Sequence, residues 1–458
     1  MKNIRLTALS VALLAAFGAP GAMAQSNEEL LKELKALRAR VDELEKKVAA
    51  QPAAKPTAAA EPKWGMTPEQ VQDFNRIAVK TEALEDSLES QGYKGLKVTG
   101  FIEPVFIYNQ RQDRAGFQFL NQQSDGYAYD TSFMGSATID FLKETESGTL
   151  WHLTLSPNRG VGAGIDGMSI VQEASVSVPL GSLQTRLIAG QIPDWSGYEY
   201  QQPTLNPFTT HNLLYDFTLP FGYTGVGLDL KEGKWWVRTA IANVNAPIRQ
   251  AHEKSPVWAF RVDYAKGEFS GWGFASLVGK SPNFNFEQKN TMAYLAEVDG
   301  YFTRGDMTLQ GQLSVGKQKE GAITPDADGN WRDSQWVGLS GLAGYMITPR
   351  LQGLVRADYI KNDKNGGGLY TYNGYYDPDN GSYNDSRNGI GPDPAGDLNR
   401  GANRYAISLG LKYAFDKATT VKLEYRLDGA DRAVFEDVTD GTFKKNNSLI
   451  GASMVVAF

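Results

Sequence analysis

The sequence predicts an all-β fold, a transmembrane antiparallel β-barrel of about 16 strands that follows a short N-terminal α-helical coiled coil. Three observations lead to this prediction. Apolar and polar residues alternate with a period of two along most of residues 95–458. Short and long polar segments separate these runs in turn, and a secretory signal precedes them. After that signal no segment holds eighteen consecutive apolar residues, so the sequence excludes transmembrane helices.

Residues 1–24 have the features of a cleaved signal peptide. Lys2 and Arg5 form a basic start, residues 6–17 are mostly apolar, and residues 22–24 are a cleavage site of the A-x-A type. The apolar run is too short to span a bilayer comfortably, which favours cleavage over an N-terminal anchor. Cleavage removes two positive charges and lowers the formal net charge from −6 to about −8, which argues against nucleic-acid binding.

Residues 25–50 predict a periplasmic coiled coil. Apolar residues follow a 4-3-4-3-4 spacing, with Glu, Lys and Arg between them, over about three heptads. A lone amphipathic surface helix is the alternative, and nothing nearby would cover its apolar seam. Val at two a positions favours a dimer, whereas the run from Arg40 to Glu45 resembles the signature of trimeric coiled coils. We favour the trimer, whose expected contact residues are Leu30, Leu34, Leu37, Arg40, Val41, Leu44, Glu45 and Val48.

Two further segments precede the barrel. Residues 51–63 hold three prolines among alanines and predict a semi-extended linker. In residues 64–92, the run Thr67-Pro68-Glu69-Gln70 matches an N-cap, a proline at N1 and a capping-box Gln, and Gly92 marks the helix end. The helix either extends the periplasmic stalk or packs into the barrel mouth, and both readings stay open.

Residues 95–458 predict the barrel through the asymmetry of its connections. Short turns are expected at 144–149, 231–234, 266–270, 303–306, 348–350 and 416–419. Long loops are expected at 109–130, 194–221, 318–334, 362–401 and 429–445. Short turns on one rim and long loops on the other resemble the periplasmic and extracellular sides of an outer-membrane barrel. A soluble β-sandwich would also alternate, but an export signal and an even strand number favour the barrel.

The last strand carries the most informative alternation. Ile450, Ala452, Met454, Val456 and the C-terminal Phe458 share one face. An apolar strand ending in Phe resembles the closing strand of bacterial outer-membrane barrels. In that group the strand closes the sheet and presents an assembly signal, so Phe458 is the expected contact for the barrel-assembly machinery.

The face opposite to the apolar one would line a water-filled lumen. Its charged residues are the expected pore wall, although neighbouring pairs such as Arg261 with Asp263 also suit simple charge neutralisation. The expected pore-wall residues are Arg186, Arg238, Arg261, Asp263, Arg356, Asp358, Arg404, Lys412, Lys422, Glu424 and Arg426.

The loop at residues 194–221 is the expected constriction. It follows a strand that ends in Gly190-Gln191-Ile192-Pro193, which resembles the strand end before the inward-folding loop of the phosphate-selective porin O/P family. That family also carries an N-terminal coiled coil, and its barrels are trimeric porins. The expected constriction residues are Asp194, Trp195, Tyr198, Glu199, Tyr200 and Asp216.

One departure from that family bears on selectivity. No Lys or Arg occurs between Arg186 and Lys231, whereas an oxyanion-selective constriction needs such residues. An acidic loop that faces basic wall residues would favour cations weakly. The alternative is that the loop folds outward as a surface lid. The segment order also resembles an uncharacterised proteobacterial family of exported proteins with a coiled coil and a barrel.

Catalytic chemistry finds little support in the sequence. Cysteine is absent, which excludes disulfides, thiolate metal sites and a lipoprotein anchor. None of the three histidines has a partner at metal-ligand spacing, and His152 with Ser156 is only a faint hydrolase candidate. We therefore expect no enzyme activity, no metal and no cofactor.

Together these features predict a bacterial outer-membrane porin, a homotrimer through which small hydrophilic solutes and ions diffuse passively past a charged constriction. A substrate-selective channel for an anion or a sugar is one alternative. A structural tether with a plugged lumen, whose coiled coil contacts the cell wall, is the other. Outer-membrane lipid and lipopolysaccharide are the expected surroundings.

Overall fold

The computed structural model describes residues 76–77, 79–80, 93–120, 134–157, 170–246, 254, 256–283, 290–371, 375–377, 382–384, 389–394 and 396–458. Residues 76–77 and 79–80 are helical and lie where the sequence predicts a helix. The signal peptide, the coiled coil and the linker lie outside the described residues, so they remain predictions. No helix within the described ranges is long and apolar enough to cross a membrane.

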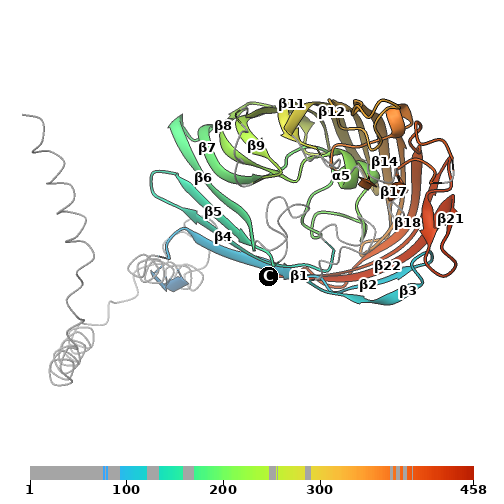
Figure 1. Cartoon of the computed structure of the whole chain (residues 1–458). Helices are drawn as coiled ribbons and strands as arrows, with labels where there is room; N and C mark the ends of the chain where they lie inside the picture. Colours follow the sequence, from blue (N-terminus) through green and yellow to red (C-terminus); the bar gives the residue numbers. More distant parts are fainter. Residues whose placement is uncertain are drawn as a thin grey trace, which may run out of the picture. The chain divides into compact units, whose positions relative to one another are not determined.

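A single antiparallel sheet of 18 strands forms the barrel (Figure 1). Its first nine strands are β1 (Leu96–Ile102), β2 (Val105–Asn109), β3 (Arg114–Gln118), β4 (Ala137–Glu144), β5 (Leu150–Leu155), β6 (Val171–Ser182), β7 (Thr185–Pro193), β8 (Gly222–Glu232) and β9 (Trp235–Val244). The others are β10 (Val257–Gly267), β11 (Ser270–Pro282), β12 (Asn290–Arg304), β13 (Met307–Gln318), β14 (Ser334–Thr348), β15 (Leu351–Lys361), β18 (Arg404–Ala414), β19 (Thr419–Ala430) and β22 (Asn446–Ala457).

Two pairs of these strands are halves of broken strands. β1 pairs with β4 and β2 pairs with β3, while both β1 and β2 pair with the terminal β22. Pro104, which has no backbone N–H to give to the ladder, lies at the break between β1 and β2. Counting each broken strand once gives a closed barrel of 16 strands. The predicted all-β antiparallel barrel and its strand number are confirmed, while the coiled coil of the predicted fold class is not tested.

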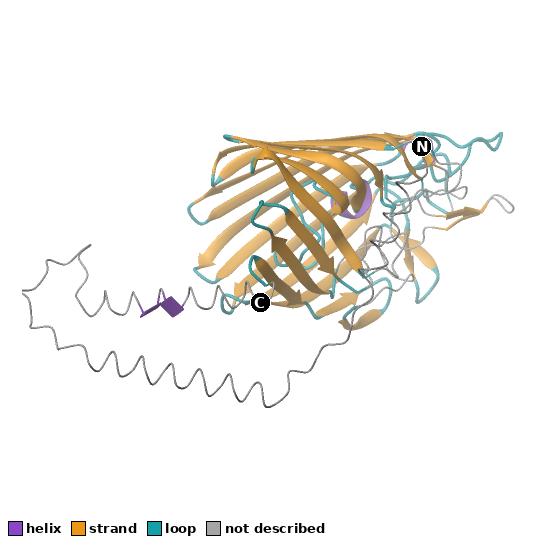
Figure 2. Ribbon diagram, turned by 90° about the vertical axis from the view of Figure 1, so that its left-hand side faces the viewer, coloured by secondary structure: helices purple, strands orange, loops and turns teal. Residues whose placement is uncertain are grey.

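Short turns and long loops alternate as the sequence predicts (Figure 2). All six expected short turns join consecutive strands, and a seventh joins β6 to β7. One expected loop differs from the structure, because residues 114–118 of the segment 109–130 form β3. Within the long loops lie the small hairpins β16 (Tyr375–Asp377) with β17 (Ser382–Asn384) and β20 (Phe435–Asp437) with β21 (Thr442–Lys444).

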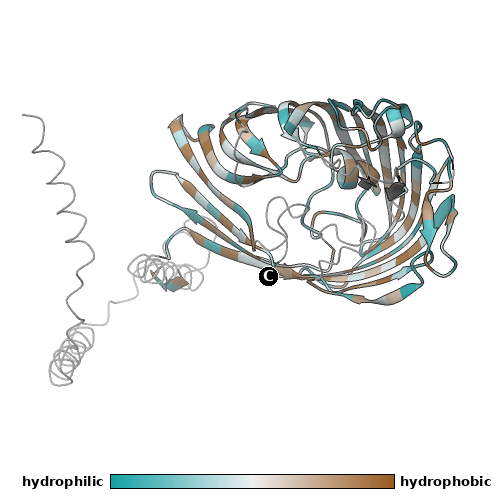
Figure 3. Ribbon diagram, in the orientation of Figure 1, coloured by the Kyte–Doolittle hydropathy of each residue, from teal (hydrophilic) through white to brown (hydrophobic). Residues whose placement is uncertain are grey.

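Hydrophobic and hydrophilic residues alternate as bands along the strands, as the period-two pattern requires (Figure 3). On β19, Leu423 is 49% exposed and Tyr425 is 44% exposed on the outside. Lys422 and Arg426, on the lumen side of the same strand, are 2% and 0% exposed. An apolar exterior around a charged interior is the reverse of a soluble protein, and it suits a barrel whose outside meets lipid.

Candidate functional site: a loop held across the lumen

The segment between β7 and β8 folds into the barrel and crosses it. It carries the short helix α5 (Leu213–Thr218), which lies inside the ring of strands in Figures 1 and 2. Its hydrogen bonds reach β12, β14, β15 and β19, which lie far around the ring from β7 and β8. We call residues 194–221 the crossing loop. The alternative of an outward surface lid is therefore wrong.

Hydrogen bonds within the crossing loop, and one from Tyr223 of the neighbouring β8, shape its start and its helix. At its start, Asp194 accepts from the Ser196 N–H at 2.8 Å and from the Tyr223 hydroxyl at 2.6 Å. Asn212 caps α5, since its side chain accepts from the Tyr215 N–H at 2.8 Å. These bonds give the segment a defined turn and a defined helix, although it does not pair with a strand as part of the sheet.

Four charged residues of the far wall then hold the loop, and we call Arg356, Asp358, Glu424 and Arg426 the wall latch. Arg356 donates to the Glu199 carboxylate at 2.9 Å and to the Thr210 carbonyl at 2.8 Å. Its second terminal nitrogen donates to the His211 carbonyl at 3.0 Å. The guanidinium of Arg356 thus binds three successive parts of the loop.

The other latch residues bind the same stretch. Glu424 accepts from the N–H and the hydroxyl of Thr210, each at 2.8 Å, and Arg426 donates to the His211 carbonyl at 2.8 Å. Asp358 accepts from the Leu213 N–H at 3.3 Å. Charge-assisted bonds of this kind are roughly twice as strong as neutral ones.

Three weaker anchors lie on either side of the latch. Lys422 donates to the Pro203 and Phe208 carbonyls at 2.7 and 3.2 Å. The Tyr198 hydroxyl lies 2.6 Å from the Ser340 hydroxyl, and the Gly197 N–H donates to Glu297 at 2.9 Å. The loop is consequently tied to the wall along most of its length.

The buried cluster holds more acid than guanidinium. It contains the carboxylates of Glu199, Asp358, Glu424 and Asp428 with the guanidinium groups of Arg356, Arg404 and Arg426, all at most 5% exposed. Burial raises the pKa of Glu199 to about 7, and Asp358 adds to the rise while Arg356 and the Asn212 N–H oppose it.

An apolar core lies under α5. Leu213, Leu214 and Phe217 are fully buried, and α5 lies beside β13, β14 and β15. The same buried core extends along the wall to small residues of β9 and β10 such as Ala240 and Ala259. Leu369 and Tyr370 of the long loop after β15 join this core, and the Tyr370 hydroxyl lies 2.8 Å from Ser281. On this side the lumen is filled by protein.

The predicted constriction residues take different positions in the loop. Trp195, Tyr198, Glu199 and Asp216 are buried, Asp194 is partly buried, and Tyr200 is 54% exposed. The loop's exposed residues are Tyr200, Thr204 and Leu205, which carry no charge. Glu199 therefore contacts the wall latch rather than water.

The predicted pore-wall residues also divide into two sets. Seven are buried, namely Arg261, Arg356, Asp358, Arg404, Lys422, Glu424 and Arg426. Four are partly exposed, namely Arg186, Arg238, Asp263 and Lys412. The pairing of Arg261 with Asp263 exists, with 2.7 Å between their charged atoms, and Arg356 with Asp358 are 3.5 Å apart. The expected trimer residues lie outside the described ranges.

Sequence reasoning missed a charged group on the uncovered wall. On β5, His152 has one ring nitrogen 2.7 Å from Asp140 of β4 and the other 2.9 Å from Glu173 of β6. A carboxylate only accepts, so a ring that donates from both nitrogens is an imidazolium. The inward phase of all three residues was the available signal. No set of three metal-ligating side chains is found among the residues that the structure describes.

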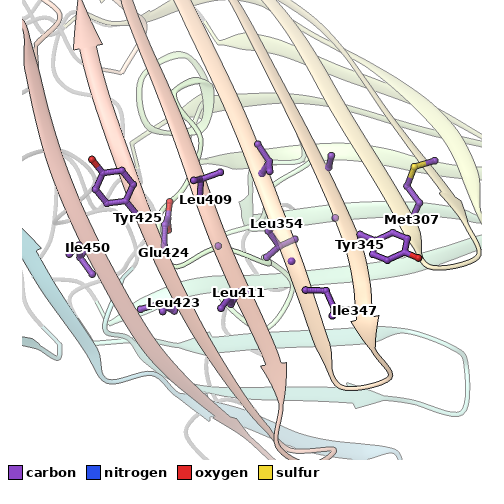
Figure 4. Close-up of a pocket in the computed structure, with 15 residues that line it drawn as sticks. Met307, Tyr345, Ile347, Leu354, Leu409, Leu411, Leu423, Glu424, Tyr425 and Ile450 are labelled. Atoms are coloured by element: carbon purple, nitrogen blue, oxygen red, sulfur yellow. The ribbon is translucent and has the colours of Figure 1, made fainter.

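A groove of about 780 Å³ lies on the barrel's outside and is not a lumen site (Figure 4). Tyr345, Leu409, Leu423 and Ile450 line it from four strands, and each is more than a third exposed on the apolar face. Its position on the apolar face suits lipid contact.

One solved structure supports the same fold, and two more are similar to this chain. An anion-selective porin from Comamonas acidovorans is similar with a TM-score of 0.50 and 10% identity, over 79% of this chain and 99% of that chain. OmpF of Salmonella typhi, in complex with daunomycin, has a TM-score of 0.49 and 12% identity over 79% and 97%. OmpT of Vibrio cholerae, in its trimer form, has a TM-score of 0.46 and 11% identity over 79% and 99%.

No curated protein matches the sequence. A family model does, and it covers residues 1–251 and 277–458. Its description is "Protein of unknown function (DUF3138)". The chain therefore belongs to the DUF3138 family.

Proposed function

We propose that this DUF3138 protein is a bacterial outer-membrane porin that lets small hydrophilic solutes and ions diffuse passively through its lumen. The observation that carries the proposal is the crossing loop, which is tied to the far wall of a 16-strand barrel by the wall latch. A barrel of this size leaves room for water, and an inward loop narrows that room to a constriction. Nothing in this mechanism needs a catalytic group, a cofactor or an energy source.

Ion preference, in this proposal, depends on charges that reach water. The loop acids Glu199 and Asp216 are at most 4% exposed, so their fields act mainly on the latch. Apart from Asp194 at the start of the loop, the partly exposed charges are on the wall and include Arg186, Arg238 and the group of His152 with its two carboxylates. The two signs are nearly balanced there, which favours weak selectivity over strict discrimination.

We further propose a trimer held partly by the coiled coil of residues 25–50. The heptad spacing and the Arg40-to-Glu45 run support it. Cross-linking of the whole mature protein, compared with a form that lacks residues 25–50, tests this proposal. A trimer band that weakens on deletion is expected, and a monomer in both forms would refute it.

The porin proposal is tested by single-channel conductance of the purified mature protein in a planar bilayer under a salt gradient. We expect stepwise openings, in threes for a trimer, with a small reversal potential. A large reversal potential, or block by one solute that saturates, would favour the substrate-selective channel. A folded barrel that stays electrically silent would refute the porin and favour the plugged tether.

A further inference from the structure

A second groove on the outside of the barrel combines an apolar floor with basic residues. It encloses about 630 Å³ on the outer faces of β11 to β15, at the ends of these strands that lead into the long loops. Val278, Tyr294, Val315 and Val337 supply apolar lining. Lys317, Lys361 and Lys364 lie at the edge of the groove nearest to the long loops.

The groove follows from the cross-strand register. Ser276 of β11 lies opposite Ala296 of β12, which lies opposite Val315 of β13. The next row toward the long loops joins Val278 to Tyr294. Two small side chains beside larger ones leave a depression, because neighbouring side chains on one face stand about 5 Å apart.

The lysines leave an excess of positive charge on this edge. Lys317 is paired with Asp333 at 2.7 Å, and Asp363, which also lines the groove, is paired with Arg400 at 3.7 Å. Lys364 is 3.4 Å from the Gln335 side chain, which is neutral. Lys361 is exposed and stands directly opposite the apolar Val337 on the outer face. Charged residues on the lipid side of a barrel are costly unless they meet headgroups or anions.

We propose that this groove binds a phosphorylated glycolipid of the lipid A class from the outer leaflet. An acyl chain would lie over Ser276 and Ala296, and the lipid phosphates would contact Lys317, Lys361 and Lys364. Long loops mark the extracellular rim of such barrels, so the edge with the lysines meets the outer leaflet. The inference rests on the proposed outer-membrane location.

Native mass spectrometry of the delipidated, full-length mature protein, titrated with lipid A that carries both phosphates, tests the proposal. We expect one tight site per barrel, and about tenfold weaker binding by the variant K317Q/K361Q/K364Q. The matched control K234Q/K266Q/K417Q removes three exposed lysines on the short-turn rim and should bind like the unchanged protein. Dephosphorylated lipid A should bind the unchanged protein as weakly as lipid A binds the groove variant.

Two results would overturn the proposal. One is equal affinity of the groove variant and the unchanged protein, and the other is an equal loss in both triple variants. Conductance measured on the same preparations separates this proposal from the porin proposal. Normal channels without a lysine-dependent lipid site would refute only the lipid site, and a silent barrel that still binds lipid A at the groove would refute only the porin.

Discussion

The substitution Arg356→Met tests whether the wall latch holds the crossing loop. Met keeps much of the length of Arg but removes the guanidinium, which makes four hydrogen bonds to Glu199, Thr210 and His211. Removing one partner of a buried ion pair costs about 3–5 kcal/mol. At about 1.4 kcal/mol for each factor of ten, the population of detached loop should rise on the order of a hundredfold or more.

The barrel itself should survive this substitution, because its strands pair independently of the loop. Apolar packing under α5 and the anchors of Lys422 and Tyr198 remain, so we expect frequent local opening rather than full release. In channel recordings this predicts greater open-channel noise. In solution it predicts faster cleavage of the loop, since proteolysis tracks the population of the open form.

Chymotrypsin and trypsin form a matched pair of probes. The loop contains Trp195, Tyr198 and Phe208, whereas no Lys or Arg lies between Arg186 and Lys231. Chymotrypsin should therefore cut the Arg356→Met loop much faster, and trypsin should not cut inside the loop at all.

Arg186→Met is the control, because Arg186 donates to Ser177, Leu183 and Gly148 and makes no bond to the loop. This variant should keep the slow chymotrypsin cleavage and the quiet channel of the unchanged protein. An Arg356→Met channel with unchanged noise and unchanged cleavage would refute the reasoning, since the latch would then contribute nothing to loop position.

Three further predictions follow from single contacts. Tyr198→Phe removes one neutral hydrogen bond worth about 1 kcal/mol, so chymotrypsin cleavage should rise about fivefold, and an unchanged rate would exclude this anchor. The pKa of Glu199 is about 7 in the attached loop against an ordinary value of 4.5, so attachment of the loop takes up a proton. Attachment is therefore firmest at acid pH and weakens as the pH rises through 7. Open-channel noise should grow from pH 5 to pH 8, and Glu199→Gln should abolish that trend. His152→Gln leaves Asp140 and Glu173 without their cation, and the reversal potential should shift toward cation preference; no shift would show that these charges do not face the ion path.

Much of the fold was predictable from the sequence for a local reason. Successive side chains in a strand point to opposite faces, so alternation in the chain reports directly which residues face lipid and which face the lumen. Short connections likewise mark one rim of the barrel, and long connections mark the other. The inward phase of Arg356 and Glu424 was visible on these grounds, whereas residues 194–221 were singled out by the resemblance of the strand end that precedes them.

The contacts that the inward-facing residues make could not be predicted from the sequence. The sequence predicted Arg356 and Arg426 as pore-wall charges, yet both are fully buried under the crossing loop. Likewise Glu199 was expected to present its charge to a constriction, and its carboxylate is bound to Arg356 of the wall. Inward-facing alanines such as Ala240 look like neutral lining in the sequence, yet they belong to the buried core that includes α5.

The sequence by itself determined the barrel, its approximate strand number and the side that each strand residue faces, because these depend on spacing within single strands and turns. Tertiary structure alone decided which inward residues meet. Glu199 and Arg356 are 157 positions apart, and they come together only after the sheet has closed and the loop has crossed the ring. Closure therefore converts wall charges into a latch, and only those that the loop leaves uncovered stay exposed in the lumen.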